Sequence, residues 1–270
     1  MFTLEGRTLI MSGASGKYVH PVILRALECG MNVCFMSGNH KRAMEGIANV
    51  PEKYRDHIIG FAQNPQYKLK LNMEMAPDIY KEDSTSQDVL KWIYDRFGSI
   101  DVCVNASGSG LAGIKDAFET DKDYWHTAAC CPEDMFFNSM YAMPYLLKSK
   151  APRIINVTAD DGFGGGWFNN PASAASKGGV ISLTKEMARE LGPKGITVNA
   201  VIHGHIETKD GDGEDMNILT DDERARMIAH TPLGRMCTRE DLASAVLFFA
   251  SEESSFVTGQ VIDVNGGLRL

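Results

Sequence analysis

Short apolar runs alternate along the chain with longer stretches in which apolar residues recur at helical spacing. Seven runs have the length and β-branched character of buried strands: Thr8–Met11, Asn32–Met36, Ile58–Ala62, Asp101–Val104, Arg153–Val157, Thr197–Val201 and Gln260–Val264. Helices are predicted between them, for example at Asp88–Phe97 and at Ala175–Leu191, which ends before Gly192-Pro193. Strands separated by helices are typical of an α/β fold. We therefore expect a doubly wound parallel sheet of seven strands, covered on both faces.

A single domain is expected over residues 1–270, because an α/β chain of this length routinely builds one core. Residues 65–86 are the least regular part of the pattern, and we interpret them as an insertion after the third strand. One alternative stays open, in which Lys68-Leu-Lys-Leu-Asn72 is itself the third strand.

The charge of the chain limits the classes of partner. The formal net charge is −8, whereas binding to nucleic acid or to an anionic membrane surface needs a basic face. No apolar run is long enough to cross a bilayer, and Met1–Gly6 lacks the features of a signal peptide. The six cysteines form no Cys-x-x-Cys pair, so we expect a reduced, cytoplasmic protein without a metal site.

The first predicted strand is followed by Ser12-Gly-Ala-Ser-Gly16, which opens a helix. Glycines in that place permit a tight turn and bring backbone N–H groups against a pyrophosphate. This turn is one of six landmarks that occur in one order: Leu4–Gly16, Ile100–Gly108, Val198–Val201, Pro232–Arg235, Glu240–Ala243 and Thr258–Gly267. Over nearly its whole length the chain resembles the short-chain dehydrogenase/reductase family, which implies a Rossmann-like fold.

The resemblance implies a catalytic group made of an asparagine, a serine, a tyrosine and a lysine. Lys177 matches the lysine of the family's Tyr-x-x-x-Lys motif, but Ser173 stands where the tyrosine belongs. Ala159 occupies the serine position, and the asparagine position falls near Pro132, give or take one residue. Three of the four catalytic groups are therefore expected to be missing.

A serine hydroxyl cannot replace a phenol as the general acid. Tyrosine titrates near pH 10 and an alcohol several units higher, near the value of about 15.7 for bulk water. We therefore favour Ser173 as a small residue at the helix entry over a ligand-binding role. The resemblance also offers the precedent of 2,4-dienoyl-CoA reductases, which carry Ser-x-x-x-Lys here and use a tyrosine upstream. Asp160 or Asp161 could supply an acid if burial raised its pKa, but we favour a solvated pair of loop residues.

The resemblance implies NAD(P) as the cofactor. The residues that match the family's cofactor-binding positions are Gly13, Ser15, Gly16, Lys17, Asn105, Lys177, Gly204, Ile206 and Thr208. Several departures weaken that site: Val19 replaces a glycine, Ser37-Gly-Asn39 provides neither an acid nor an arginine for the ribose, and His203 replaces a proline. We therefore expect weak or absent cofactor binding. His203 and His205 could titrate, but a structural role is favoured for both.

Two functions are compatible with this pattern. We favour a catalytically degenerate subunit that assembles with an active NAD(P)-dependent relative acting on hydroxyacyl-CoA-type substrates. The alternative is an active oxidoreductase with a rearranged site built on Ser173 and Lys177. The stretches Pro232–Ala250 and Thr258–Gly267 stay close to the family pattern, and the resemblance implies subunit interfaces there. A dimer or tetramer is expected when the chain is expressed alone.

Overall fold

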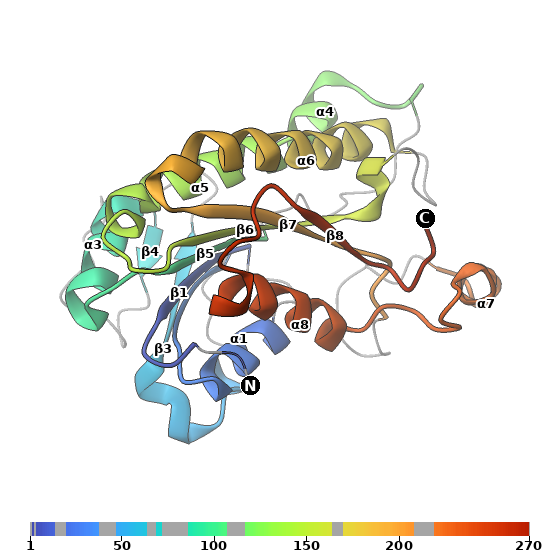
Figure 1. The fold of residues 1–270 in the computed structure, drawn as a ribbon. Helices are drawn as coiled ribbons and strands as arrows, with labels where there is room; N and C mark the ends of the chain where they lie inside the picture. Colours follow the sequence, from blue (N-terminus) through green and yellow to red (C-terminus); the bar gives the residue numbers. More distant parts are fainter. Residues whose placement is uncertain are drawn as a thin grey trace.

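The computed structural model describes residues 2, 4–13, 20–37, 47–63, 69–71, 86–106, 117–163, 170–207 and 219–269. An eight-stranded sheet runs through the molecule in the order β4-β3-β2-β1-β5-β6-β7-β8 (Figure 1). The strands are β1 (Thr8–Ser12), β2 (Asn32–Ser37), β3 (Ile58–Gln63), β4 (Leu69–Leu71), β5 (Val102–Asn105), β6 (Arg153–Ala159), β7 (Thr197–His203) and β8 (Val261–Val264).

The predicted parallel sheet of seven strands is confirmed, because every neighbouring pair from β3 to β8 is parallel. The eighth strand is the short β4, which pairs antiparallel with β3 at the edge of the sheet. The alternative that took Lys68–Asn72 as the third strand is therefore wrong. The expected insertion at 65–86 lies, apart from β4 and the start of the next helix, outside the described residues.

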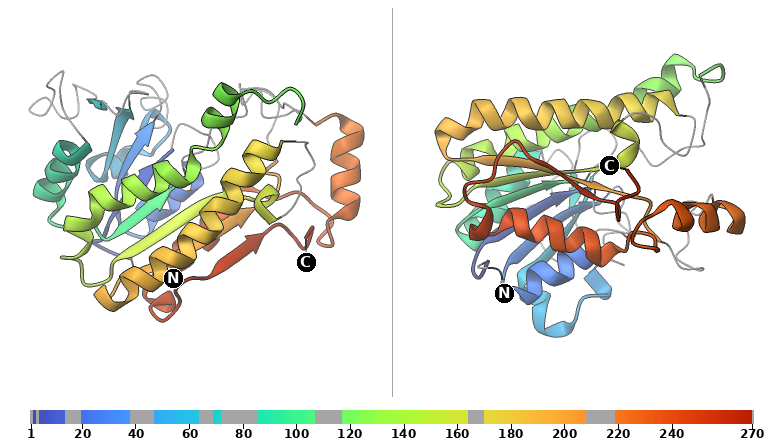
Figure 2. Two further views of the ribbon diagram at one scale, coloured as in Figure 1. Left: turned by 90° about the horizontal axis from the view of Figure 1, so that it is seen from above. Right: turned by 45° about the vertical axis from the view of Figure 1, so that its right-hand side comes forward.

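Helices cover both faces of the sheet (Figures 1 and 2). α1 (His20–Glu28) and α8 (Arg239–Ala250) pack on one face, while α3 (Ser86–Phe97), α5 (Cys131–Leu146) and α6 (Pro171–Leu191) pack on the other. The structure also describes two shorter helices, α4 (Lys122–Ala128) and α7 (Asp221–His230). It contains four 3-10 turns in the described residues: η1 (Glu52–His57), η2 (Asp160–Phe163), η3 (Gly192–Lys194) and η4 (Glu252–Ser254). None of these described helices combines the length and the apolar character that crossing a membrane requires.

α6 begins four residues before the predicted start at Ala175, at Pro171. The side chain of Asn170 accepts a hydrogen bond from the backbone N–H of Ser173 at 3.1 Å and so caps the helix. Proline is tolerated at the first helical position, as at Pro171, because an N–H there would have no intrahelical partner. Ser173 therefore lies in the first turn of the helix, rather than before it.

A chain of buried polar side chains joins the sheet to α5 and α6. The Asn105 amide donates to Ser139 Oγ and to Asn156 Oδ1, both at 2.9 Å, and the Asn156 amide donates to Thr184 Oγ1 at 2.9 Å. All four side chains are completely buried. Because a buried polar group is costly without a partner, this network holds the two helices in register over β5 and β6.

Candidate functional site at the carboxyl ends of the central strands

The strand order reverses between β1 and β5, and doubly wound sheets bind ligands outside the carboxyl ends of the strands at that point. Ser12 ends β1 and pairs with Asn105, which ends β5. Gly13 follows with a φ of 73°, a left-handed conformation that favours glycine at the start of the turn. The remaining predicted residues of this turn, Ser15, Gly16 and Lys17, lie outside the described residues.

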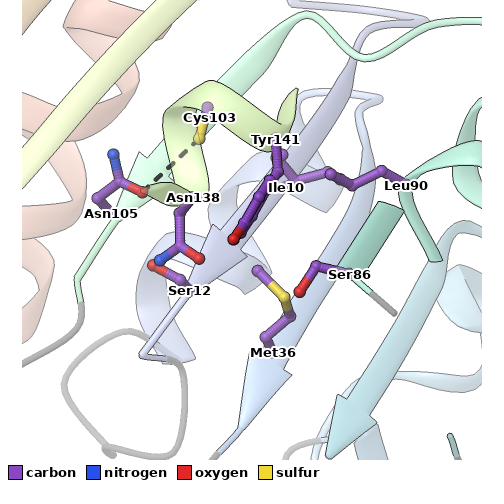
Figure 3. Close-up of a pocket in the computed structure, with 9 residues that line it drawn as sticks. All are labelled: Ile10, Ser12, Met36, Ser86, Leu90, Cys103, Asn105, Asn138 and Tyr141. Atoms are coloured by element: carbon purple, nitrogen blue, oxygen red, sulfur yellow. Dashed lines mark hydrogen bonds between the residues drawn. The ribbon is translucent and has the colours of Figure 1, made fainter. Parts of the chain in front are cut away.

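Asn105, predicted as a cofactor-binding residue, lies inside the protein in this structure. Its side chain is completely buried, and its amide group is used by Ser139 and Asn156. A small cavity does adjoin it between the sheet, α3 and α5 (Figure 3). The residues that line the cavity are Ile10, Ser12, Met36, Ser86, Leu90, Cys103, Asn105, Asn138 and Tyr141. None of the catalytic candidates on α6 belongs to it.

The carboxyl end of β7 carries the residues predicted to face the nicotinamide. Gly204 packs so closely on the last strand that a Cβ there would lie 3.1 Å from the Asn265 Cα. Ile206 is buried and forms a bridge with Cys237, while Thr208 lies outside the described residues. Gly204 and Ile206 therefore both have a packing role within the protein.

Ser173 and Lys177 lie on one face of α6, as their spacing predicted, but each contacts another protein group. The Ser173 hydroxyl donates to Asp161 Oδ2 at 2.6 Å. The Lys177 ammonium donates to the thiol sulfur of Cys131 at 3.5 Å. η2 packs directly on this part of α6, because a Cβ on Gly162 would lie 2.7 Å from the Lys177 carbonyl carbon.

The prediction that Asp160 and Asp161 form a solvated loop pair is wrong. They open η2 at the end of β6, and Asp160 Oδ2 and Asp161 Oδ1 are both buried without a hydrogen-bond partner. Loss of hydration raises the pKa of Asp160 to about 6, although Arg269 Nε lies 3.8 Å from its Oδ2 and opposes the shift. The ends of β6 and β7 pair as far as Ala159 and His203, which brings η2 inside the protein.

The residue that faces Lys177 from α5 is Cys131 rather than Pro132, one position before the one predicted. Pro132 instead packs against α6 at Gly179, where a Cβ would lie 2.9 Å from the proline Cγ. Cys131 is completely buried in a small cluster with Met135 and Val180. The sequence could not distinguish the two positions, because a turn of the chain between α4 and α5 sets the register of α5.

His203 ends β7 near Lys177, Asp161 and His205. Its Nδ1 lies 2.8 Å from the Gly204 carbonyl oxygen. Desolvation lowers the pKa of His203 to about 4, and the charge of Lys177 adds to that effect. The ring is therefore neutral at pH 7.

Sequence reasoning missed Tyr124. This residue of α4 lies beside the start of α6, where the Asn170 amide donates to its hydroxyl at 2.8 Å. Its contact depends on α4 lying over α6, and no spacing in the sequence indicates that. Within the described parts of the chain, no group of His, Cys, Asp and Glu residues is arranged to hold a metal ion.

Comparison with known proteins places this site in a family context. Residues 48–269 match a family model described as Enoyl-(Acyl carrier protein) reductase. The chain is 32% identical over 269 residues to 3-oxoacyl-[acyl-carrier-protein] reductase FabG of Vibrio harveyi, covering 99% of each protein. It is 31% identical over 269 residues to the FabG of Staphylococcus epidermidis, covering 98% of this chain and 99% of the relative.

Among solved structures, the fold is similar to a short-chain dehydrogenase/reductase of the glucose/ribitol dehydrogenase type from Brucella melitensis. The TM-score is 0.81 at 25% sequence identity, and the match covers 100% of this chain and 99% of that one. The similarity therefore extends over the whole sheet and its helices.

Proposed function

The chain belongs to the short-chain dehydrogenase/reductase family of oxidoreductases, and we propose that it serves there as a catalytically degenerate subunit of an assembly with an active relative. One observation carries the proposal. The two residues left from the family's catalytic group contact other protein groups, Ser173 the carboxylate of Asp161 and Lys177 the thiol of Cys131.

Acidity supports the same conclusion. The phenol that the family uses is replaced by the alcohol of Ser173, and each unit of pKa between the two corresponds to about 1.4 kcal/mol. One lysine cannot close a gap of several units. The described residues therefore do not fit hydride transfer to a carbonyl in the family's usual way. The named relatives are reductases of 3-oxoacyl thioesters, so the active partner is expected to act on an acyl thioester.

One exposed surface in particular supports assembly. The apolar run Ala245–Ala250, which lies within the stretch Pro232–Ala250, is buried mainly in the chain's own core, since Val246, Leu247, Phe249 and Ala250 are completely buried. α5 offers a better surface. Phe136 and Phe137 are 37% and 40% exposed on that helix, and the Phe137 ring stacks on Tyr141 at 6.2 Å. Large apolar groups gathered on one face indicate an interaction site.

We expect the purified chain to be a dimer or tetramer in light scattering, and a Phe136→Glu/Phe137→Glu variant to be smaller. The two charges would have to be buried in the interface without partners, which weakens association. Phe118→Glu is the matched control, because Phe118 is fully exposed outside α5. A tagged chain should also recover a family member with an intact Tyr-x-x-x-Lys motif from the native source. A monomeric wild type at micromolar concentration contradicts the proposal.

A second candidate function is an active NAD(P)-dependent oxidoreductase with a rearranged site, similar to 2,4-dienoyl-CoA reductases. One observation favours it. Asp161 is in direct hydrogen-bond contact with Ser173, and its second carboxylate oxygen is buried without a partner.

Calorimetric titration with NADH and NADPH separates the two candidates. We expect dissociation constants weaker than roughly 1 mM for the degenerate subunit, because several lost hydrogen bonds at about 1 kcal/mol each take a micromolar site to that range. Micromolar binding of either cofactor favours the active oxidoreductase instead. The control is a relative with the intact motif, titrated under the same conditions.

A further inference from the structure

Two adjacent thiols lie at the beginning of α5, next to Lys177. Cys130 is the N-cap residue of the helix and Cys131 its first helical residue. The Lys177 ammonium is 3.5 Å from the sulfur of Cys131, and the thiols of Cys130 and Cys131 are hydrogen-bonded to each other. The proposed function uses the contact between Lys177 and Cys131 only as evidence that the lysine is occupied, and it assigns no role to the two thiols.

Cys131 is the thiol of the pair that contacts the lysine. A neighbouring ammonium and a helix N-terminus both stabilise a thiolate, and Cys131 has both. The pKa of Cys130 is raised, chiefly because its proton is shared with Cys131 and also because Cys130 is partly buried. The buried thiol of Cys103 differs, since burial raises its pKa to about 12 and no cation in the described part of the chain acts on it. The pair thus combines a thiol beside an ammonium with a thiol whose pKa is not lowered by any cation among the described residues.

The two sulfurs also differ in access. Cys130 is partly exposed, whereas Cys131 is completely buried behind it. Closure to a disulfide is disfavoured, because Cα atoms of consecutive residues lie about 3.8 Å apart and ordinary disulfides span about 4.4–6.8 Å. A larger atom that binds both sulfurs, without a direct bond between them, avoids that constraint.

We propose that Cys130 and Cys131 form a dithiol site for small thiophilic electrophiles that accept two sulfur ligands, with trivalent arsenicals as the representative class. An organoarsenous oxide enters at the exposed Cys130, and Cys131 completes the bridge. Two S–H bonds and the bonds from arsenic to oxygen break, while two As–S bonds form. The oxygen leaves as water with both thiol protons. Arsenic stays trivalent and neither sulfur is oxidised, so no further reactant is needed.

The test is mass spectrometry of the reduced full-length chain after treatment with phenylarsine oxide. We expect a phenylarsenic adduct that survives a wash with the monothiol glutathione and is removed by dithiothreitol, as bidentate capture requires. Cys130→Ser and Cys131→Ser should each lose the retained adduct, while Cys103→Ala keeps it. Lys177→Met should slow capture about tenfold, because a rise of one unit in the thiol pKa leaves a tenth of the thiolate.

Three outcomes would overturn the proposal: an adduct retained in either serine variant, an adduct lost in Cys103→Ala, or a wild-type adduct that glutathione removes. An unchanged rate in Lys177→Met would exclude the role of the lysine. If Cys131→Ser does not fold, the partly exposed Cys130→Ser decides the question, and circular dichroism of each variant establishes that it is folded.

Discussion

An Asn156→Leu variant should lose about 3 kcal/mol of its free energy of unfolding, since buried polar groups left without partners cost about 1–3 kcal/mol each. Leucine has a similar volume, so the loss reports hydrogen bonds rather than a cavity. The Asn105 amide would lose its acceptor, and Thr184 Oγ1 would lose its donor. Both groups are completely buried, so water cannot replace Asn156. Denaturant unfolding followed by circular dichroism measures the change.

Two comparisons make this result specific to the network. Asn49→Leu alters an exposed asparagine and should change stability by less than about 0.5 kcal/mol. Thr184→Val combined with Asn156→Leu should cost less than the sum of the two single changes, because both remove the same hydrogen bond. A loss below about 1 kcal/mol in Asn156→Leu, or strict additivity in the double variant, would contradict the structure.

Replacing Asp160 with asparagine should stabilise the protein at pH 7, by up to about 3 kcal/mol. The pKa of Asp160 is raised from 3.8 to about 6, and each unit corresponds to about 1.4 kcal/mol of preference for the protonated form. At pH 7 the folded protein therefore holds a carboxylate that the unfolded chain accommodates more easily. Asparagine keeps the shape of the side chain and removes the charge. Denaturant unfolding at several pH values measures the effect.

The pH dependence has a definite sign. Because the folded protein binds the Asp160 proton more tightly, that group's contribution is fully present below about pH 4 and is lost as the pH rises through about 6. His203 acts in the opposite direction. Its pKa is lowered from 6.5 to about 4, so its contribution is present above pH 6.5 and is lost as the pH falls through about 4.

In the wild type, the effects of Asp160 and His203 on the pH dependence of stability have opposite signs. Asp160→Asn should therefore make stability rise between about pH 4 and 6.5, while His203→Asn should make it fall over the same window. Identical profiles for the wild type and both variants would show that neither group is perturbed by folding.

The fold was largely predictable because its strands are buried on both faces and read as continuous apolar runs. The site was less predictable. The predicted strands at Arg153–Val157 and Thr197–Val201 stop short of β6 and β7, which continue to Ala159 and His203. Three of the four added residues, Thr158, Ala159 and His203, are polar or small, so hydropathy gives little sign that they still belong to the sheet. Asp160 consequently looked like a solvated loop residue, although the longer strands bring it inside.

The sequence by itself determined the doubly wound parallel sheet and the common face of Ser173 and Lys177, since these depend on local periodicity and residue identity. Only the tertiary structure decided what those two side chains contact. Asp161 reaches Ser173 from the end of β6, and Cys131 reaches Lys177 from the start of α5. Such contacts depend on the register between elements far apart in the chain, which packing sets and no single segment encodes.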